Sequence, residues 1–207
     1  MRKRRHKMKM AKTLVPTFLF VLALALAACG GASPGTGPAQ VDLTDLDGLT
    51  EAYLRPILFS GATRSTWIDP NNIRANMLVD MYGYMNIWSA DIPESEMEFE
   101  NGTPYYYLDE AILEDYVQSY FDVALGHLRS AYQYHAERKA YAFNVSGVGW
   151  AYDPHVKRAE YDTSTEGLTL YLDDGIGEME GEAAALTIQL SEGGSFKYIS
   201  NEAVPIR

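Results

Sequence analysis

The 207-residue chain has a single cysteine, and two long stretches of it, residues 75–128 and 159–196, contain no lysine or arginine. One cysteine excludes a disulfide within the chain and a zinc site built from cysteines alone. The lack of basic residues over such long stretches argues against nucleic-acid binding through a general basic surface. With 47% hydrophobic and 12% aromatic residues, the chain also differs from an acidic disordered tail.

The formal net charge of −11 is unevenly distributed along the chain. The first 28 residues hold seven basic residues and no acidic one, so residues 29–207 carry ten basic and 28 acidic residues, a net charge of −18. Residues 13–26 form an apolar run that is shorter than the ~20 residues needed to cross a bilayer of ~30 Å. A basic segment followed by a short apolar run is typical of a cleaved secretory signal.

The apolar run ends in the sequence Leu26-Ala27-Ala28-Cys29, which contains the only cysteine of the chain. This sequence resembles the lipobox of bacterial lipoproteins. The resemblance implies that the signal peptide, residues 1–28, is cut before Cys29 and that the Cys29 sulfur receives a diacylglyceryl group. We therefore predict a protein that is lipid-anchored to a bacterial membrane on its extracytoplasmic side. The alternative is an ordinary secretory signal with a chance cysteine.

The segment after the cysteine, residues 29–41, is rich in glycine, proline and small polar residues. Such a composition predicts a flexible tether between the lipid and the rest of the chain. The remainder, residues 42–207, is long enough for one domain with its own core, and it contains no internal repeat.

Apolar residues at helical spacing predict a first helix over residues 44–58. A second helix is expected from Asp69, an N-cap candidate, with Pro70 at the first helical position. Ile68 and Ile73 stand where a hydrophobic staple would pack at that helix start. The Met-rich and aromatic stripe that follows is interpreted as a core face rather than as a cofactor pocket.

Asp109 is expected to cap a third helix. A short further helix is expected over residues 123–132. The dipeptide Asn101-Gly102 indicates a small hairpin before it. After residue 140 apolar and polar residues alternate, which predicts antiparallel strands. These strands are expected near residues 139–143, 150–152, 156–161, 168–172, 184–190 and 196–198.

The predicted fold class is therefore α+β, with two or three N-terminal helices packed on a C-terminal antiparallel sheet of four to six strands. The order of elements is similar to the cone-shaped fold of nuclear transport factor 2, which is the alternative. That resemblance rests on element order alone and implies no role for any residue.

Aromatic side chains are the first candidates for a ligand site, because tyrosine and tryptophan offer both an apolar body and a polar group. The candidate residues are Trp67, Trp88, Trp150 and Tyr152, with the tyrosines of residues 105–107 as possible neighbours. The alternative is that these rings pack in the core and on sheet faces.

Acidic side chains suggest two further interpretations. The negative charge could face a cation or a basic partner. Alternation of acids could also build a calcium site, for which the candidates are Glu94, Glu96, Glu98 and Glu100. The alternative to both interpretations is an acidic surface that is only solvated.

No catalytic residue, metal site or cofactor is assigned from the sequence. His127, His135 and His155 lie in no zinc-protease motif, and no Gly-x-Ser-x-Gly motif places a nucleophile. We predict a non-enzymatic binding or interaction module of the cell envelope. Its expected partners are the membrane, through lipid on Cys29, and an envelope protein, a peptide or a glycan. The alternatives are a hydrolase or isomerase with the cone-shaped fold and a calcium-dependent assembly or adhesion component.

Overall fold

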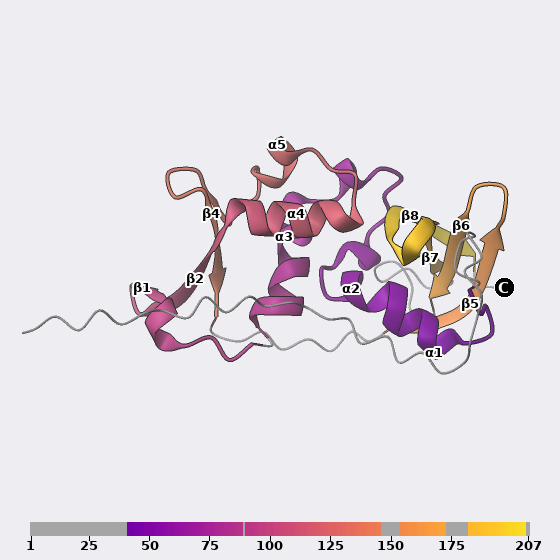
Figure 1. Ribbon diagram of the computed structural model, residues 1–207, viewed down its shortest axis with the longest axis horizontal. Coiled ribbons are helices and arrows are strands. Elements are labelled where there is room, and N and C mark those ends of the chain that lie inside the picture. Colours follow the sequence, from indigo (N-terminus) through magenta and orange to yellow (C-terminus); the bar gives the residue numbers. More distant parts are fainter. Residues whose placement is uncertain (1–40, 89, 146–153, 173–181, 206–207) are drawn as a thin grey trace, which may run out of the picture. The chain divides into compact units, whose positions relative to one another are not determined.

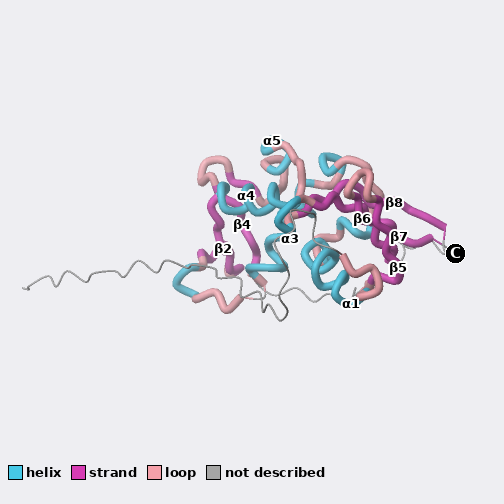
Figure 2. The backbone as a smooth tube through the Cα atoms, turned by 45° about the vertical axis from the view of Figure 1, so that its right-hand side comes forward, coloured by secondary structure: helices cyan, strands magenta, loops and turns pink. Residues whose placement is uncertain are grey.

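The computed structural model describes residues 41–88, 90–145, 154–172 and 182–205 (Figures 1 and 2). By its contacts the chain divides into two units, Met1–Gly35 and Thr36–Arg207, and all described residues lie in the second unit. None of the helices described has the length and apolar character needed to cross a membrane.

The first helical segment consists of α1 (Leu46–Leu49), a π-helical turn (Thr50–Leu54) and α2 (Arg55–Leu58), which confirms the helix predicted there. Asp45 begins it as an N-cap, because its Oδ1 accepts the Gly48 N–H at 2.9 Å. Pro56 has no N–H to donate to the preceding turn. In that turn the Arg55 N–H bonds to the Thr50 carbonyl five residues back, so the wider turn lets the helix continue.

The second helix begins later than predicted. Asp69 caps only a 3₁₀ turn, Pro70–Asn72, and helix α3 (Ala75–Tyr82) starts after an extended link. The predicted staple is also wrong, because Ile68 is 74% exposed while Ile73 is buried. Ile68 is exposed because the preceding residue, Trp67, forms a β-bridge to a strand that is distant in the sequence.

That bridge joins Trp67 to Asn201, whose backbone groups exchange hydrogen bonds of 2.9 and 2.8 Å. The Trp67 side chain is buried and its Nε1 donates to the Ala62 carbonyl at 3.0 Å. Successive side chains of an extended segment point in opposite directions. Burial of Trp67 therefore leaves Ile68 facing solvent.

Helix α3 continues into a π-helical turn, Gly83–Ile87, in which the Trp88 N–H donates to the Gly83 carbonyl at 2.9 Å. A Cβ atom at Gly83 would lie 2.7 Å from the Trp88 ring and 2.9 Å from the Phe143 ring. Glycine is therefore required at this close approach of helix, indole and strand.

Helix α4 (Glu110–Tyr120) begins as predicted, because the Asp109 Oδ1 accepts the Ala111 N–H at 2.9 Å. The short helix expected over 123–132 is smaller than predicted: α5 spans only Leu125–Leu128. It follows an extended Ala124 that offers no side-chain cap. The segment therefore forms a single turn of helix.

The C-terminal strands form one antiparallel sheet, here called sheet A, in the order β5-β6-β7-β8. Its strands are β5 (Val156–Asp162), β6 (Gly167–Leu172), β7 (Glu182–Leu190) and β8 (Phe196–Pro205). The predicted alternation is confirmed: Leu168, Leu170 and Leu172 are buried and the residues between them are partly exposed.

A second antiparallel sheet, sheet B, has the order β1-β2-β4-β3. Its strands are β1 (Glu98–Glu100), β2 (Thr103–Asp109), β3 (Tyr134–His135) and β4 (Ala140–Asn144). The prediction of α+β is confirmed, but the strand near 139–143 does not join the C-terminal sheet. It pairs with β2 instead, so that Tyr106 lies opposite Phe143 and Leu108 opposite Tyr141.

Helix α4 connects the two sheets. It follows directly after β2 and contacts β2 and β4 of sheet B as well as β8 of sheet A (Figure 1). Val117 on this helix and Phe121, the extended residue that follows it, are fully buried. One continuous hydrophobic core thus includes side chains of both sheets and of the helices. The geometry places the last turn of α4 against β8, where the candidate site lies.

Candidate binding site

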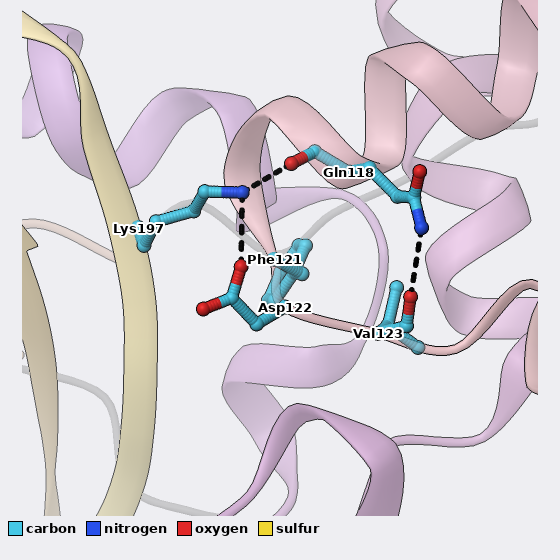
Figure 3. A pocket seen from close by; sticks show the side chains of 5 residues that line it. All are labelled: Gln118, Phe121, Asp122, Val123 and Lys197. Atoms are coloured by element: carbon cyan, nitrogen blue, oxygen red, sulfur yellow. Dashed lines mark hydrogen bonds and ion pairs between the residues drawn. The ribbon is translucent and has the colours of Figure 1, made fainter.

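An open cavity of about 450 Å³ lies where the end of α4 approaches β8 (Figure 3). Four of its lining residues come from the last turn of α4 and the segment after it, and the fifth comes from β8. They are Gln118, Phe121, Asp122, Val123 and Lys197.

The end of α4 needs an outside donor. The last four carbonyls of a helix have no partner inside it and together carry a partial negative charge. The Phe121 N–H satisfies the Val117 carbonyl at 2.9 Å. Lys197 Nζ donates to the Gln118 carbonyl from the neighbouring strand. Because residues 75–128 contain no lysine or arginine, this cation has to come from another part of the chain.

Lys197 also pairs with Asp122, with 3.2 Å between Nζ and Oδ1. The lysine side chain is 32% exposed and the aspartate side chain 86% exposed. An ion pair this exposed contributes about 0–1 kcal/mol. The Asp122 carboxylate can therefore leave Lys197 for a ligand at little cost, whereas Lys197 stays held by the helix end.

The apolar floor of the cavity is fixed by packing. The Phe121 ring is fully buried, with its centroid 5.0 Å from that of Tyr198 and 6.1 Å from that of Trp67. Gln118 Nε2 donates to the Val123 carbonyl at 3.0 Å and closes the turn after the helix.

Asn71 holds the same turn from outside. Its Nδ2 donates to the Asp122 carbonyl at 3.3 Å, and its Oδ1 accepts the Ala124 N–H at 3.1 Å. Hydrogen bonds from both Gln118 and Asn71 thus hold the segment 122–124. A site that is formed before its ligand arrives binds without paying to order its own groups.

The five lining residues offer one carboxylate, one ammonium, one amide and an apolar floor. Sequence reasoning missed Lys197 and Asp122. The available signal was that Lys197 is the first basic residue after a stretch of 38 residues without one.

The aromatic candidates do not form one site in the described residues. Trp67 is buried behind Phe121 and supports the cavity without lining it. Trp88 donates from Nε1 to the Asn144 carbonyl at 2.6 Å and packs on Tyr84 and Phe143. Trp150 and Tyr152 lie outside the described residues.

Trp88 does line a smaller hollow of about 150 Å³. The other residues around it are mostly apolar: Ile87, Ala90, Asp91, Ile92, Met97 and Val145. Trp88 therefore borders this hollow, while its ring packs between α3 and β4.

The four glutamates proposed as calcium ligands do not come together. Glu94 and Glu96 lie on a 3₁₀ turn rather than an extended segment. Glu98 pairs with Arg138 at 2.8 Å, and Glu100 accepts the Tyr107 hydroxyl hydrogen. In the part of the chain that the structure describes, no three His, Cys, Asp or Glu side chains are grouped as metal ligands.

The hydrogen bond to Glu100 raises the pKa of Tyr107 to about 12. Beside it, the Arg138 guanidinium lies 4.1 Å from the centre of the Tyr107 ring. The acidic side chains of β1 are thus engaged with the aromatic and basic residues of sheet B.

The three histidines are dispersed over the fold. His127 Nε2 lies 2.7 Å from the Ile73 carbonyl, and His135 Nδ1 lies 3.5 Å from Glu137. His155 is exposed at the start of β5. Cys29, the predicted lipidation site, lies outside the described residues.

Comparison with known proteins gives a family and no function. The sequence model of a family of unknown function, DUF6070, matches residues 71–206. No curated protein and no solved structure matches the chain. The matched range contains helices α3 to α5, both sheets and the whole lining of the cavity.

Proposed function

The chain belongs to the DUF6070 family of unknown function, and we propose that it is a lipid-anchored, extracytoplasmic module that binds a basic partner through the cavity at the end of α4. The observation that carries the anchoring is the sequence Leu26-Ala27-Ala28-Cys29, which ends a short apolar run and contains the only cysteine. Two or more acyl chains hold a protein firmly, since each buried CH₂ contributes about 0.8 kcal/mol.

The charge of the chain supports a basic partner. Once residues 1–28 are removed the chain carries −18, and a field of that sign speeds the approach of cations and disfavours anions. Asp122 is the exposed anion of the cavity, whereas the apolar lining residues Phe121 and Val123 are almost completely buried. A peptide segment with an exposed lysine or arginine fits this arrangement.

The anchor is tested by the substitution Cys29→Ala in the full chain. We expect loss of labelling by a fatty-acid analogue and retention of the uncut signal in the intact mass. Ser33→Ala, in the tether, is the matched control and should label like the unchanged protein. An unchanged protein that carries no lipid by intact mass contradicts the anchoring.

The binding site is tested with two capped peptides, Gly-Lys-Leu-Gly and Gly-Glu-Leu-Gly, titrated against the full chain in neutral detergent micelles. We expect only the lysine peptide to shift the NMR signals of residues 121–123. Asp122→Asn should weaken its binding about two- to fivefold, the equivalent of an exposed ion pair of about 0.5–1 kcal/mol. Asp115→Asn, an exposed change on α4 away from the cavity, is the control. Equal shifts with both peptides would contradict a site for basic partners.

A further inference from the structure

A half-buried carboxyl group outside the cavity, that of Asp80, lies on α3. Its residue is partly exposed, and its Oδ1 accepts one hydrogen bond, from Gln133 Nε2 at 2.9 Å. Among the ion pairs between described residues, none includes Asp80. The carboxyl group has therefore lost part of its hydration without gaining a cation, which is costly for its ionised form.

Gln133 is fixed and incompletely bonded. Its side chain is buried, with 5% of the residue exposed, and its backbone carbonyl accepts the Ala142 N–H of β4 at 2.8 Å. The amide nitrogen bonds Asp80, but the amide oxygen Oε1 is buried without a hydrogen-bond partner among the described residues. A buried acceptor without a donor costs about 1–3 kcal/mol.

Among the described residues, the groups around Asp80 supply neither the missing donor nor a positive charge. The titratable groups that face it are the phenols of Tyr84, on the same helical segment, and of Tyr132, next to Gln133. Burial raises the pKa of both, and the charge of Asp80 raises it further. A proton on Asp80 itself would supply a donor, since a protonated carboxyl group donates one hydrogen bond and still accepts another.

We propose that Asp80 and Gln133 form a proton-operated brace between α3 and the β3–β4 end of sheet B. In the protonated state the Asp80 hydroxyl donates to Gln133 Oε1 while Gln133 Nε2 donates to Asp80, so that both polar side chains are satisfied. In the ionised state the first bond is lost, the amide oxygen stays unpaired and the carboxylate stays poorly hydrated. The brace is tight at acid pH and loosens toward neutral pH.

The titration range follows from burial. Burial raises the pKa of Asp80 from 3.8 to about 6, and the hydrogen bond from Gln133 partly opposes it. Because the folded state holds this proton more tightly than the unfolded state, its stabilising effect is complete below pH 3.8 and is lost as the pH rises through about 6. Between pH 5 and 7 the loss corresponds to about a tenfold fall in the folding equilibrium.

The test uses the full chain in neutral detergent micelles, with Asp80 followed by the NMR signal of its side-chain carboxyl carbon. We expect a midpoint near pH 6. Hydrogen exchange at the Ala142 amide, corrected for the intrinsic rate, should lose about tenfold protection from pH 5 to 7. Asp80→Asn keeps one donor and one acceptor and so imitates the protonated state. It should remove that loss, whereas the exposed Asp91→Asn should retain it.

Every other titratable group is present in both proteins, so the difference between wild type and Asp80→Asn isolates Asp80. If Asp80→Asn does not fold, the wild-type midpoint decides. A midpoint near 4, or equal pH dependence in wild type and Asp80→Asn, overturns the proposal.

Discussion

Sheets A and B have the same number of strands and the same antiparallel pairing, but they are held to the helices by different interactions. Sheet A presents an apolar face of leucine, isoleucine and alanine to the core. Sheet B is held to α4 and α5 by tyrosines and charges, chiefly Glu114, Arg129 and Tyr141. The alternation in the sequence predicted the strands of sheet A. For sheet B the sequence indicated single strands and a hairpin, but not that they form a second sheet.

The polar connection of sheet B is well formed. Arg129 donates to Glu114 from Nε at 2.7 Å and from Nη2 at 3.0 Å, and the Tyr141 hydroxyl donates to the same carboxylate at 3.2 Å. The Tyr134 hydroxyl donates to Glu110 at 2.6 Å. The hydrogen bond to Glu114 raises the pKa of Arg129.

The largest expected effect is a loss of packing in sheet A. Leu186 is fully buried on β7, between β6 and β8. Leu186→Ala removes its contacts and leaves a cavity, at a cost of about 3–4 kcal/mol in the free energy of unfolding measured with urea. The same change in sheet B, Leu108→Ala, should lower the free energy of unfolding by about 2–3 kcal/mol, because polar contacts also stabilise that sheet. Equal losses in the two variants would contradict the view that sheet A depends more on apolar packing than sheet B.

The next effect tests the charges of sheet B. Arg129→Met leaves Glu114, whose side chain is 6% exposed, without its cation. We expect a loss of about 2–3 kcal/mol, below the usual cost for a buried pair because the arginine is 38% exposed. The double change Arg129→Met with Glu114→Leu should recover part of this loss in the same urea measurement. Additive losses would show that the pair is not coupled.

A smaller effect is expected where α3 meets sheet B. Gly83→Ala would force its Cβ against the rings of Trp88 and Phe143, at a cost of about 1–3 kcal/mol. Gly126→Ala is the matched control, since nothing lies within 4 Å of a Cβ at that position of α5. It should be neutral or stabilising by about 0.5–1 kcal/mol. The thermal midpoint should therefore fall for Gly83→Ala and stay unchanged or rise for Gly126→Ala.

The smallest effect concerns the junction of α4 with sheet A. Lys197→Met removes both the bond to the Gln118 carbonyl and the ion pair with Asp122. We expect a loss of about 1 kcal/mol. Asp122→Asn breaks only the ion pair and should cost less. If the two variants unfold at the same urea concentration, the contact with the helix end contributes nothing.

The sequence allowed correct prediction wherever the signal was local. The Asp109 cap of α4 and the alternation in β6 depend on residues a few positions apart, and both are confirmed. The late start of α3 depends on the bridge between Trp67 and Asn201, which no local pattern reveals.

The candidate site could not be predicted for the same reason. Lys197 reaches the Gln118 carbonyl across 79 positions of the chain, and neither residue belongs to a motif. The pairing of β2 with β4 was hidden as well, because tyrosines occupy both faces of β2 and blur the alternation. What was missed in the fold and in the site is long-range pairing between polar residues.

The bridge at Trp67 affects how readily neighbouring molecules could pair through their sheet edges. An open sheet edge is a template for pairing with a neighbouring chain. Trp67 occupies part of the outer edge of β8, and at the opposite edge the Val156 N–H of β5 is taken by Thr50 Oγ1 at 3.1 Å. If the chains are anchored by lipid as proposed, they share one plane, and these two contacts, with the charged side chains of β5, disfavour the pairing of strands between neighbouring molecules.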